Sequence, residues 1–141
     1  MITIERDEIG RVNVVHTPDD SNYDGGSDKM KMVTCIVRPE KLESIADTLD
    51  KMHIVGMTVT DVRGFGRQKG QVEHYRGGEY TIRFINKVRL DVVVQDEDVK
   101  KVMEAVSKAA STGNVGDGKI FVTPVENAMR IRTKEVGTSA L

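Results

Sequence analysis

Two amphipathic helical patterns, separated by two strand patterns, restrict the fold of this chain more than any other feature. In both, apolar residues recur at the three- and four-residue spacing of one helix face. The first pattern follows Pro39, which can begin a helix, and the second follows Asp96, which we expect to be its N-cap, with Gly113 as its C-cap. The apolar residues are Leu42, Ile45, Ala46, Leu49 and Met52, and then Val99, Val102, Met103, Val106 and Ala109. Each helix therefore has one side to bury against a sheet.

Strand patterns surround the two helices. They occupy residues 31–38, 54–62, 87–94 and 119–125, where β-branched and alternating apolar residues dominate. The resulting order β-α-β-β-α-β is that of the ferredoxin-like α+β sandwich, an antiparallel sheet with both helices on one face. This fold hosts many unrelated functions, so the function has to be sought in particular residues.

The beginning of the chain differs in character from the rest. In residues 1–16, apolar and polar residues alternate in two short segments on either side of an acidic turn, which predicts a β-hairpin. Residues 17–29 are rich in Asp, Ser and Gly, as in a flexible linker. We therefore expect an N-terminal extension over residues 1–29 and a single ferredoxin-like domain over residues 30–141.

The charge and composition exclude several classes of function. Lys and Arg number 21 and Asp and Glu 22, so a net charge of -1 gives no general attraction to nucleic acid or to anionic membranes. Aromatic residues make up 4 % of the chain and Trp is absent, which disfavours base stacking by an RNA-binding domain. No apolar run has the length of a membrane span, and the N-terminus lacks the pattern of a signal peptide. We expect a soluble cytoplasmic protein with no membrane insertion and no nucleic-acid partner.

Cysteine and histidine give no sign of a metal or redox site. Cys35 stands in the apolar run 32–37, and we expect it to be a small buried side chain. His16, His53 and His74 lack the spacing of metal ligands, so no structural metal is expected.

A long polar segment, residues 64–84, joins the second and third predicted strands. A loop of this length inside a compact domain is usually functional or disordered. It combines adaptable backbone with basic side chains, which favours an anionic ligand or an acidic partner surface. These residues are Gly64, Gly66, Gly70, Gly77 and Gly78, with Arg67, Lys69, Arg76 and Arg83. A solvated hairpin tip is the alternative interpretation.

Residues 112–119, TGNVGDGK, form a second glycine-rich segment. It nearly matches the phosphate-loop motif G-x-x-x-x-G-K-[ST], but Ile120 replaces the hydroxyl residue, and the segment leads from a helix into a strand instead of the reverse. It is therefore not a Walker A site. Its glycines and Lys119 can still present main-chain N–H groups and an ammonium to an anion, although a plain helix-to-strand turn explains the same residues.

Near the C-terminus, Arg130 and Arg132 stand two residues apart and share one face if the segment is extended. Guanidinium groups suit phosphate oxygens, whereas solvated surface charges are the alternative. A basic loop, a glycine-lysine loop and an arginine pair together match the needs of a nucleoside triphosphate.

Four segments of the chain resemble the signatures of the PII nitrogen-regulatory signal transduction proteins. They are GMTVTDVRGFGRQKG at residues 56–70, YRGGEY at 75–80, TGNVGDGKIFV at 112–122 and RIRT at 130–133. The resemblance spans about residues 30–133. It implies a ferredoxin-like subunit in a homotrimer, with ATP or ADP bound in the clefts between subunits. In the terms of that family, residues 64–84 are the T-loop, 112–119 the B-loop and 130–133 the C-loop.

The resemblance also implies roles for individual residues. The nucleotide would be held by Gly116, Asp117, Gly118 and Lys119 of one subunit, by Arg130 and Arg132 from the C-loop, and by Thr58, Gly64 and Arg67. Gln68 would be a ligand of a Mg²⁺ ion shared by ATP and 2-oxoglutarate, and Lys69 and Lys87 would bind the oxoglutarate.

Three further positions bear on the resemblance. Tyr80 aligns with a tyrosine that many bacterial members have uridylylated, and Arg76 aligns with a loop-tip arginine that plugs an ammonium channel. Asp91 stands where many relatives have Glu.

The resemblance implies a non-catalytic nitrogen and energy sensor. Its T-loop would regulate a partner such as an ammonium transporter or an enzyme of nitrogen metabolism. The alternative is a slow ATP-hydrolysing or acyl-phosphatase-like enzyme on the same fold, although no nucleophile–base pair is visible.

Overall fold

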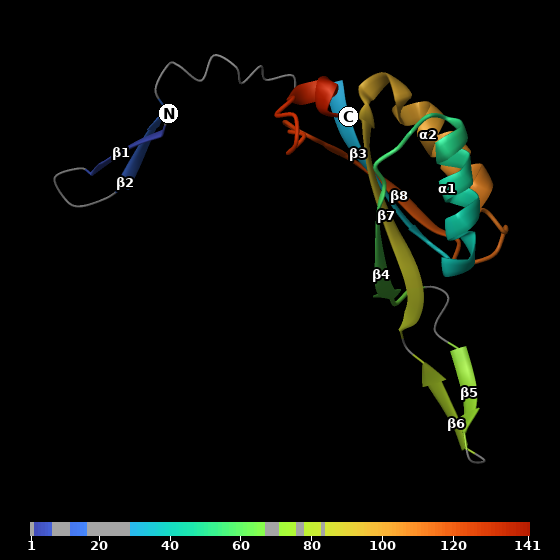
Figure 1. Cartoon of the computed structure of the whole chain (residues 1–141). Helices are drawn as coiled ribbons and strands as arrows, with labels where there is room; N and C mark the ends of the chain where they lie inside the picture. The colour runs from blue at the N-terminus through green and yellow to red at the C-terminus, as the bar shows by residue number, and fades with distance from the viewer. Residues whose placement is uncertain (1, 7–11, 17–28, 67–70, 76–77, 83) are drawn as a thin grey trace.

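A four-stranded antiparallel sheet forms the body of the protein, in the order β4-β7-β3-β8 (Figure 1). The computed structural model describes residues 2–6, 12–16, 29–66, 71–75, 78–82 and 84–141. The strands of the sheet are β3 (Met30–Val37), β4 (Thr58–Gly64), β7 (Ile85–Gln95) and β8 (Gly118–Pro124). Helices α1 (Leu42–Lys51) and α2 (Val99–Ala110) lie together on one face of the sheet. This arrangement confirms the ferredoxin-like α+β fold predicted from the order of the elements.

The core lies between the sheet and the two helices. Alternate residues of β3 and β7 face the helices, because successive side chains of a strand point to opposite sides. They meet Ile45 and Leu49 of α1 and Val102 and Val106 of α2, which are at most 1 % exposed. The inward strand residues are Val33, Cys35 and Val37, and Val88, Leu90, Val92 and Val94. Burying one larger aliphatic side chain stabilises the fold by about 1.5–3 kcal/mol.

Cys35 is a free cysteine within this core. Burial, with a smaller contribution from the charge of Asp91, raises the pKa of its thiol to about 11. The protonated thiol packs as a small apolar group, which confirms the role predicted for it.

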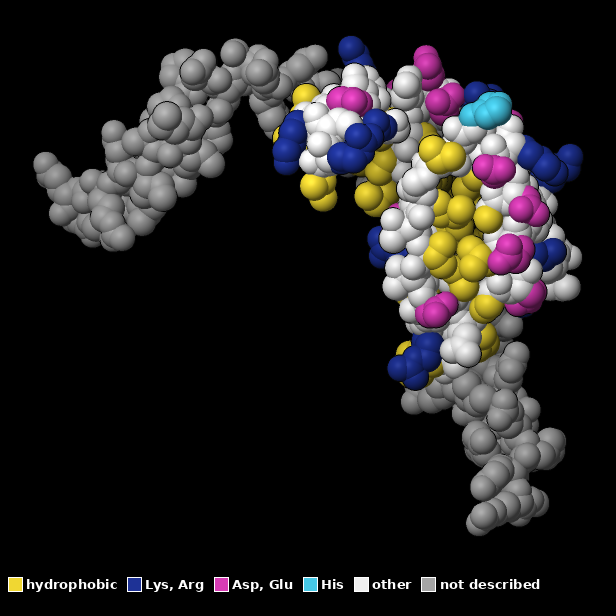
Figure 2. Space-filling view, in the orientation of Figure 1, with side chains coloured by type: hydrophobic (Ala, Val, Ile, Leu, Met, Phe, Trp, Pro, Cys, Tyr) yellow, Lys and Arg dark blue, Asp and Glu magenta, His cyan; other side chains and the backbone are white. Residues whose placement is uncertain are grey.

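The edge strand β4 is less well covered than the centre of the sheet. Figure 2 shows apolar side chains at the surface between the sheet and α1, and Val59, which pairs with the buried Leu90, is 44 % exposed. The helices therefore seal the centre of the sheet and leave one edge partly open.

Neither α1 nor α2 covers the opposite face of the sheet, called here the open face. Residues directly opposite each other on neighbouring strands share a face, so the strand register identifies what lies there. Its middle includes Met32, Ile36, Val93 and Phe121, and Phe121 is 51 % exposed. The chain therefore presents an uncovered apolar surface on this side.

Asp91 is held by its neighbours on the open face. Its carboxylate accepts hydrogen bonds from the Thr34 hydroxyl at 2.5 Å and from Nε of Arg89 at 2.9 Å. The bond from Arg89 is the main reason that the pKa of Asp91 lies below its usual range. Both carboxylate oxygens thus have partners within the sheet.

The helices are short, and their termini differ from the predicted caps. The 3-10 turn before α2 has Gln95 as its N-cap, so the prediction of Asp96 as N-cap is wrong. The C-cap of α2 is Ser111 in an extended conformation, so the prediction of Gly113 as C-cap is also wrong. No helix among the described residues is long and apolar enough to span a membrane.

All four strands of the sheet differ in extent from the prediction: β3 and β8 each begin and end one residue earlier, and β4 and β7 differ more. β4 starts at Thr58 instead of residue 54, because His53 at φ 60° and Gly56 at φ 86° take left-handed conformations that a strand cannot continue. β7 extends beyond the predicted residues 87–94 at both ends and contains 11 residues. Its extra length carries it to the base of the T-loop.

The T-loop contains a two-stranded hairpin of its own, β5 (Gln71–Tyr75) and β6 (Gly78–Ile82), which forms a separate sheet (Figure 1). At its base Gly64 pairs with Ile85, and the ring centroids of Phe65 and Phe84 lie 6.0 Å apart. The described part of the T-loop is therefore a hairpin arm that leaves the sheet between β4 and β7. A further separate hairpin, β1 (Ile2–Arg6) and β2 (Val12–His16), lies near the N-terminus.

Candidate functional site

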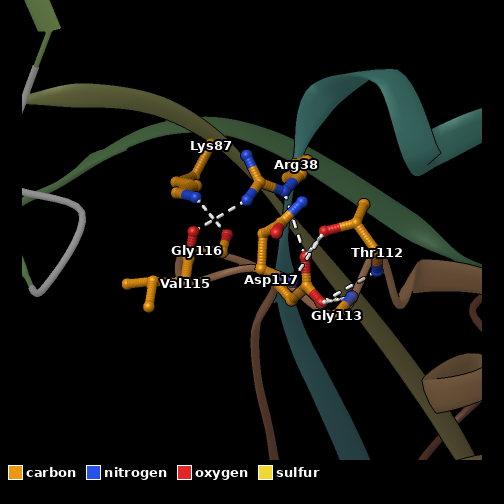
Figure 3. A network of polar contacts seen from close by, with 8 residues as sticks. Arg38, Lys87, Thr112, Gly113, Val115, Gly116 and Asp117 are labelled. Carbon is orange, nitrogen blue, oxygen red and sulfur yellow. Dashed lines mark hydrogen bonds and ion pairs between the residues drawn. The ribbon is translucent and has the colours of Figure 1, made fainter.

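The glycine-rich loop between α2 and β8 is shaped by the carboxylate of Asp117 (Figure 3). Oδ2 accepts the main-chain N–H groups of Thr112 at 2.8 Å and of Gly113 at 2.9 Å, and Oδ1 accepts the Thr112 hydroxyl. These hydrogen bonds, those from Thr112 above all, hold the pKa of Asp117 well below its usual range. The carboxylate is an internal anchor of the loop.

A row of charged residues joins this loop to the sheet. In the last paired row of the sheet, Val37 of β3 lies between Val88 of β7 and Gly118 of β8. The next residue along each chain segment is Arg38, Lys87 or Asp117, so these three lie opposite one another. Adjacent rows of a sheet point to opposite faces, and the last paired row belongs to the core. The charged row therefore lies on the open face.

Two cations of this row hold the B-loop. Arg38 donates from Nε to Asp117 at 3.2 Å and from Nη2 to the carbonyl oxygen of Val115 at 2.8 Å (Figure 3). Lys87 donates from Nζ to the carbonyl oxygen of Gly116 at 2.5 Å. The side chains of Arg38 and Asp117 are only 16 % and 25 % exposed, so their ion pair is partly shielded from water. Lys87 of β7 and Arg38, which follows β3, thus hold the B-loop against the sheet.

Positive charge gathers at this end of the open face, called here the basic end. In the next row on the same face, Arg89 and Lys119 lie on either side of Ile36. Partial burial, and then the charge of Arg38, lower the pKa of Lys87, because both disfavour its charged form. An anion bound here would relieve that repulsion, so the basic end favours a phosphate or carboxylate ligand.

Gly118 sets the close approach of the loop to β3. It has φ 108°, and a Cβ atom on it would lie 1.7 Å from the carbonyl oxygen of Ile36. Only glycine allows this geometry, which lets β8 begin beside β3 and places Lys119 opposite Ile36.

The arginines of the C-loop lie at the other end of the sheet. β8 leads away from the basic end, and the N–H of Val125 bonds to the carbonyl oxygen of Met30 at the start of β3. Beyond this point Arg130 donates to Glu135 at 3.3 Å and to the carbonyl oxygen of Leu141 at 3.0 Å. A strand of 7 residues such as β8 spans about 20 Å, so one chain does not bring Arg130 to Lys119.

The C-loop is also not extended. Residues 131–133 form a turn, so the condition under which Arg130 and Arg132 would share one face is not met. Arg132 is exposed.

Thr58 and Gly64 mark the two ends of β4. Thr58 lies opposite Asp91, so it shares the open face with the basic end, and Gly64 lies at the base of the T-loop arm. Arg67, Gln68, Lys69 and Arg76 lie outside the described residues. Tyr80 belongs to β6, where its main chain pairs with Glu73.

Comparison with known proteins decides the family. The family profile described as "Nitrogen regulatory protein P-II" matches residues 30–135. This chain belongs to the nitrogen regulatory protein P-II family. The match confirms the resemblance found in the sequence, and the family is one of regulatory proteins.

Individual P-II relatives agree with this assignment. Nitrogen regulatory protein P-II of Microchaete diplosiphon is 53 % identical over 112 residues, which cover 79 % of this chain and 100 % of that protein. Nitrogen regulatory protein GlnK of Escherichia coli strain K12 is 51 % identical with the same coverage. The crystal structure of Arabidopsis thaliana PII bound to citrate has a TM-score of 0.67 and 38 % identity, covering 81 % of this chain and 94 % of that one. The P-II match begins at residue 30, so residues 1–29 lie outside it.

Arg38 is the residue of the candidate site that the sequence interpretation missed. It stands at the end of a strand and before Pro39, where an arginine is unremarkable. Its partner Asp117 is 79 residues away in the sequence, and only the strand register brings the two together. The signal that could have found it is that register, which a single sequence does not display.

Proposed function

We propose that this P-II protein is a nitrogen and energy sensor that binds ATP or ADP and 2-oxoglutarate and regulates partner proteins through its T-loop arm. The observation that carries the proposal is the basic end of the open face, where the B-loop, which includes Lys119, lies beside Lys87 and Arg38. Lys87 is two residues past Ile85, which closes the base of the arm. A ligand at the basic end therefore lies where it can bias the conformation of the arm.

The nucleotide phosphates would be bound by the B-loop. Gly116 and Gly118, at φ 102° and 108°, allow the main chain to approach a phosphate closely, and Lys119 adds an ammonium. Asp117 would contribute through its main chain, because its carboxylate is engaged within the loop. Thr58, Gly64 and Arg67 would complete the nucleotide site.

Arg130 and Arg132 would reach the phosphates from a second copy of the chain. Since Lys119 and Arg130 lie at opposite ends of β8, one triphosphate can contact both only across a subunit boundary. The uncovered apolar residues of the open face, such as Phe121, supply a surface on which copies can associate. We propose a homotrimer, as the family resemblance implies.

The acid site would be built around Lys87. We propose that its ammonium pairs with a carboxylate of 2-oxoglutarate, together with Lys69. The Arabidopsis relative was crystallised bound to citrate, also a carboxylate ligand, which supports acid binding in this family.

A Mg²⁺ ion would connect the acid to the nucleotide. Oxygen atoms of ATP and of the acid would supply most of its ligands, because Mg²⁺ in proteins is usually held by substrate phosphates and only one or two protein groups. Gln68 would be the protein ligand. This arrangement makes acid binding depend on ATP.

The partner would be an ammonium transporter or an enzyme of nitrogen metabolism. Arg76 would contact it from the tip of the arm, and Tyr80 is the candidate for modification. Peptide mass spectrometry of cells grown under several nitrogen conditions tests the modification of Tyr80. A Tyr80 peptide of unshifted mass under every condition would exclude it. The cytoplasmic location inferred from composition stays a prediction.

Isothermal titration calorimetry tests the sensor function. We expect ATP to bind in the micromolar range and 2-oxoglutarate to bind only when ATP and Mg²⁺ are both present. Equal oxoglutarate binding without nucleotide would contradict the shared-metal arrangement. Steady-state ATP turnover above roughly 1 per second would favour the enzymatic alternative, because that is an ordinary rate for an enzyme.

A further inference from the structure

Arg38 and Lys87 hold two successive carbonyl groups of the B-loop. The carbonyl oxygen of Val115 accepts from Arg38 at 2.8 Å, and that of Gly116 accepts from Lys87 at 2.5 Å (Figure 3). In a planar trans peptide the C=O and the N–H point in opposite directions. The N–H of Gly116 shares a peptide with the first carbonyl, and the N–H of Asp117 shares one with the second. Both N–H groups therefore point away from the two cations.

This arrangement is the main-chain geometry that binds anions. Successive N–H groups turned to one side form a concave nest for a phosphate or carboxylate oxygen, and it requires alternating backbone conformations. Gly116 at φ 102° supplies the conformation that an L side chain rarely adopts. The orientation of the two N–H groups thus depends on the cations that hold the carbonyls on the other side.

Arg38 is suited to this task because it makes two contacts at once. Its planar guanidinium reaches the Asp117 carboxylate at 3.2 Å and the Val115 carbonyl at 2.8 Å, whereas a lysine ammonium in its place would be a single point charge. Asp117 in turn holds Thr112 and Gly113 at the beginning of the loop. Arg38 therefore fixes both the carbonyl side of the loop and its internal anchor.

We propose that Arg38 is a positioning residue of the nucleotide site, which fixes the B-loop so that the N–H groups of Gly116 and Asp117 are offered to a phosphate. This inference rests on the proposed nucleotide binding and adds to it the residue that preorganises the loop. Arg38 acts through the loop and does not touch the nucleotide. Its loss therefore affects every nucleotide that uses these N–H groups, whatever the number of phosphates.

The test compares ATP and ADP affinity, measured by calorimetry, in Arg38→Met and Arg38→Lys. Because a hydrogen-bonded charge partner is lost, we expect both variants to bind both nucleotides about tenfold more weakly, with the same factor for ATP and ADP. The amide NMR signals of Gly116 and Asp117 should shift in the ligand-free variants. Lys100→Met, which removes an exposed positive charge from α2, is the matched control and should leave affinity and signals unchanged.

Lys119→Met is the reference variant for the loss of a side chain that contacts the phosphates directly in the proposed site. It should weaken ATP more than ADP and reduce the salt dependence of ATP binding. The same behaviour in Arg38→Met, or full recovery in Arg38→Lys, would assign Arg38 a direct charge contact and overturn the proposal. Wild-type affinity in Arg38→Met would also overturn it. Absence of nucleotide binding by the wild-type protein would remove the proposed function and this role with it, and the amide signals would still show whether Arg38 shapes the loop.

Discussion

Asp117 and Arg38 are 79 residues apart in the sequence, and their side chains meet at 3.2 Å. This ion pair joins the glycine-rich loop after α2 to the residue that follows β3. The B-loop is thus shaped by a carboxylate within it and a guanidinium from outside it.

Asp117→Asn should lower thermal stability at neutral pH, because the amide cannot accept all the hydrogen bonds that the carboxylate accepts. The pKa of Asp117 is lowered in the folded state, so its stabilisation is complete above the unfolded pKa of about 3.9 and declines as pH falls further. The difference in Tm between wild type and variant should be constant from pH 7 to about 5 and shrink below about 4. Melting curves followed by circular dichroism check this, and a difference that grows as pH falls would contradict it.

Gly118→Ala should destabilise the protein by about 3 kcal/mol or more, because the new Cβ would meet the Ile36 carbonyl at 1.7 Å in a backbone conformation reserved for glycine. Gly113→Ala is the matched control, since its φ is also positive, at 82°, but nothing lies within 4 Å of the added atom. It should cost only about 1–2 kcal/mol. Urea unfolding at one fixed protein concentration measures both, and equal costs would refute the close approach.

Lys87→Met should weaken 2-oxoglutarate binding by at least about tenfold and ATP binding by less, since in the proposed acid site its ammonium pairs with a carboxylate of the acid. The pKa of Lys87 is lowered, so the ammonium loses its proton at a lower pH than an ordinary lysine, and wild-type oxoglutarate affinity should fall early as pH rises. Lys87→Arg keeps its charge and should abolish that alkaline decline. Calorimetry at a series of alkaline pH values measures the oxoglutarate affinity of both proteins. If the affinity of Lys87→Arg declines with pH as that of the wild type does, Lys87 is excluded as the titrating group.

Mixed oligomers should restore binding that each parent lacks. Lys119→Met damages the site from the B-loop side and Arg132→Met from the C-loop side, so both homomeric variants should bind ATP poorly. Random mixing of equal amounts should rebuild about a quarter of the sites, because each head-to-tail interface needs an intact B-loop from one subunit and an intact C-loop from the next. Titration of co-refolded protein measures this fraction. No recovery, with mixing verified by mass spectrometry, would show that both residues act within one chain.

Deletion of residues 1–29 should leave the oligomeric mass and the ATP affinity unchanged, because the P-II match begins at residue 30. Light scattering and calorimetry on the shortened chain test this. A smaller particle would show that the extension helps to assemble the subunits.

The helices and the strand order could be predicted because they follow from local periodicity. Apolar residues such as Ile45 and Val102 recur at helical spacing, and they are the most buried residues of the two helices. The helix caps and the start of β4 could not be predicted, because each depends on the backbone conformation of a single residue, such as Ser111 or His53. Periodicity carries no information about such residues.

The site was predictable only in part for a related reason. The glycines and the lysine of residues 112–119 can be recognised from the sequence alone, and the resemblance to the P-II family points to Lys87 as well. The row of Lys87, Arg38 and Asp117 is instead produced by the register of three strands, and no local pattern marks Arg38 as a member of it.

The contact between Lys87 and the carbonyl of Gly116 has a consequence for how two ligands can communicate. In the proposed acid site, a carboxylate that pairs with the ammonium would weaken the hydrogen bond between Lys87 and the B-loop. The acid and the nucleotide would then compete for Lys87, although a shared Mg²⁺ ion would favour their joint binding. By thermodynamic linkage, the factor by which the acid changes the affinity for the nucleotide equals the factor by which the nucleotide changes the affinity for the acid. In the proposed sensor, a single lysine would thus set how strongly the acid and the nucleotide affect each other's binding.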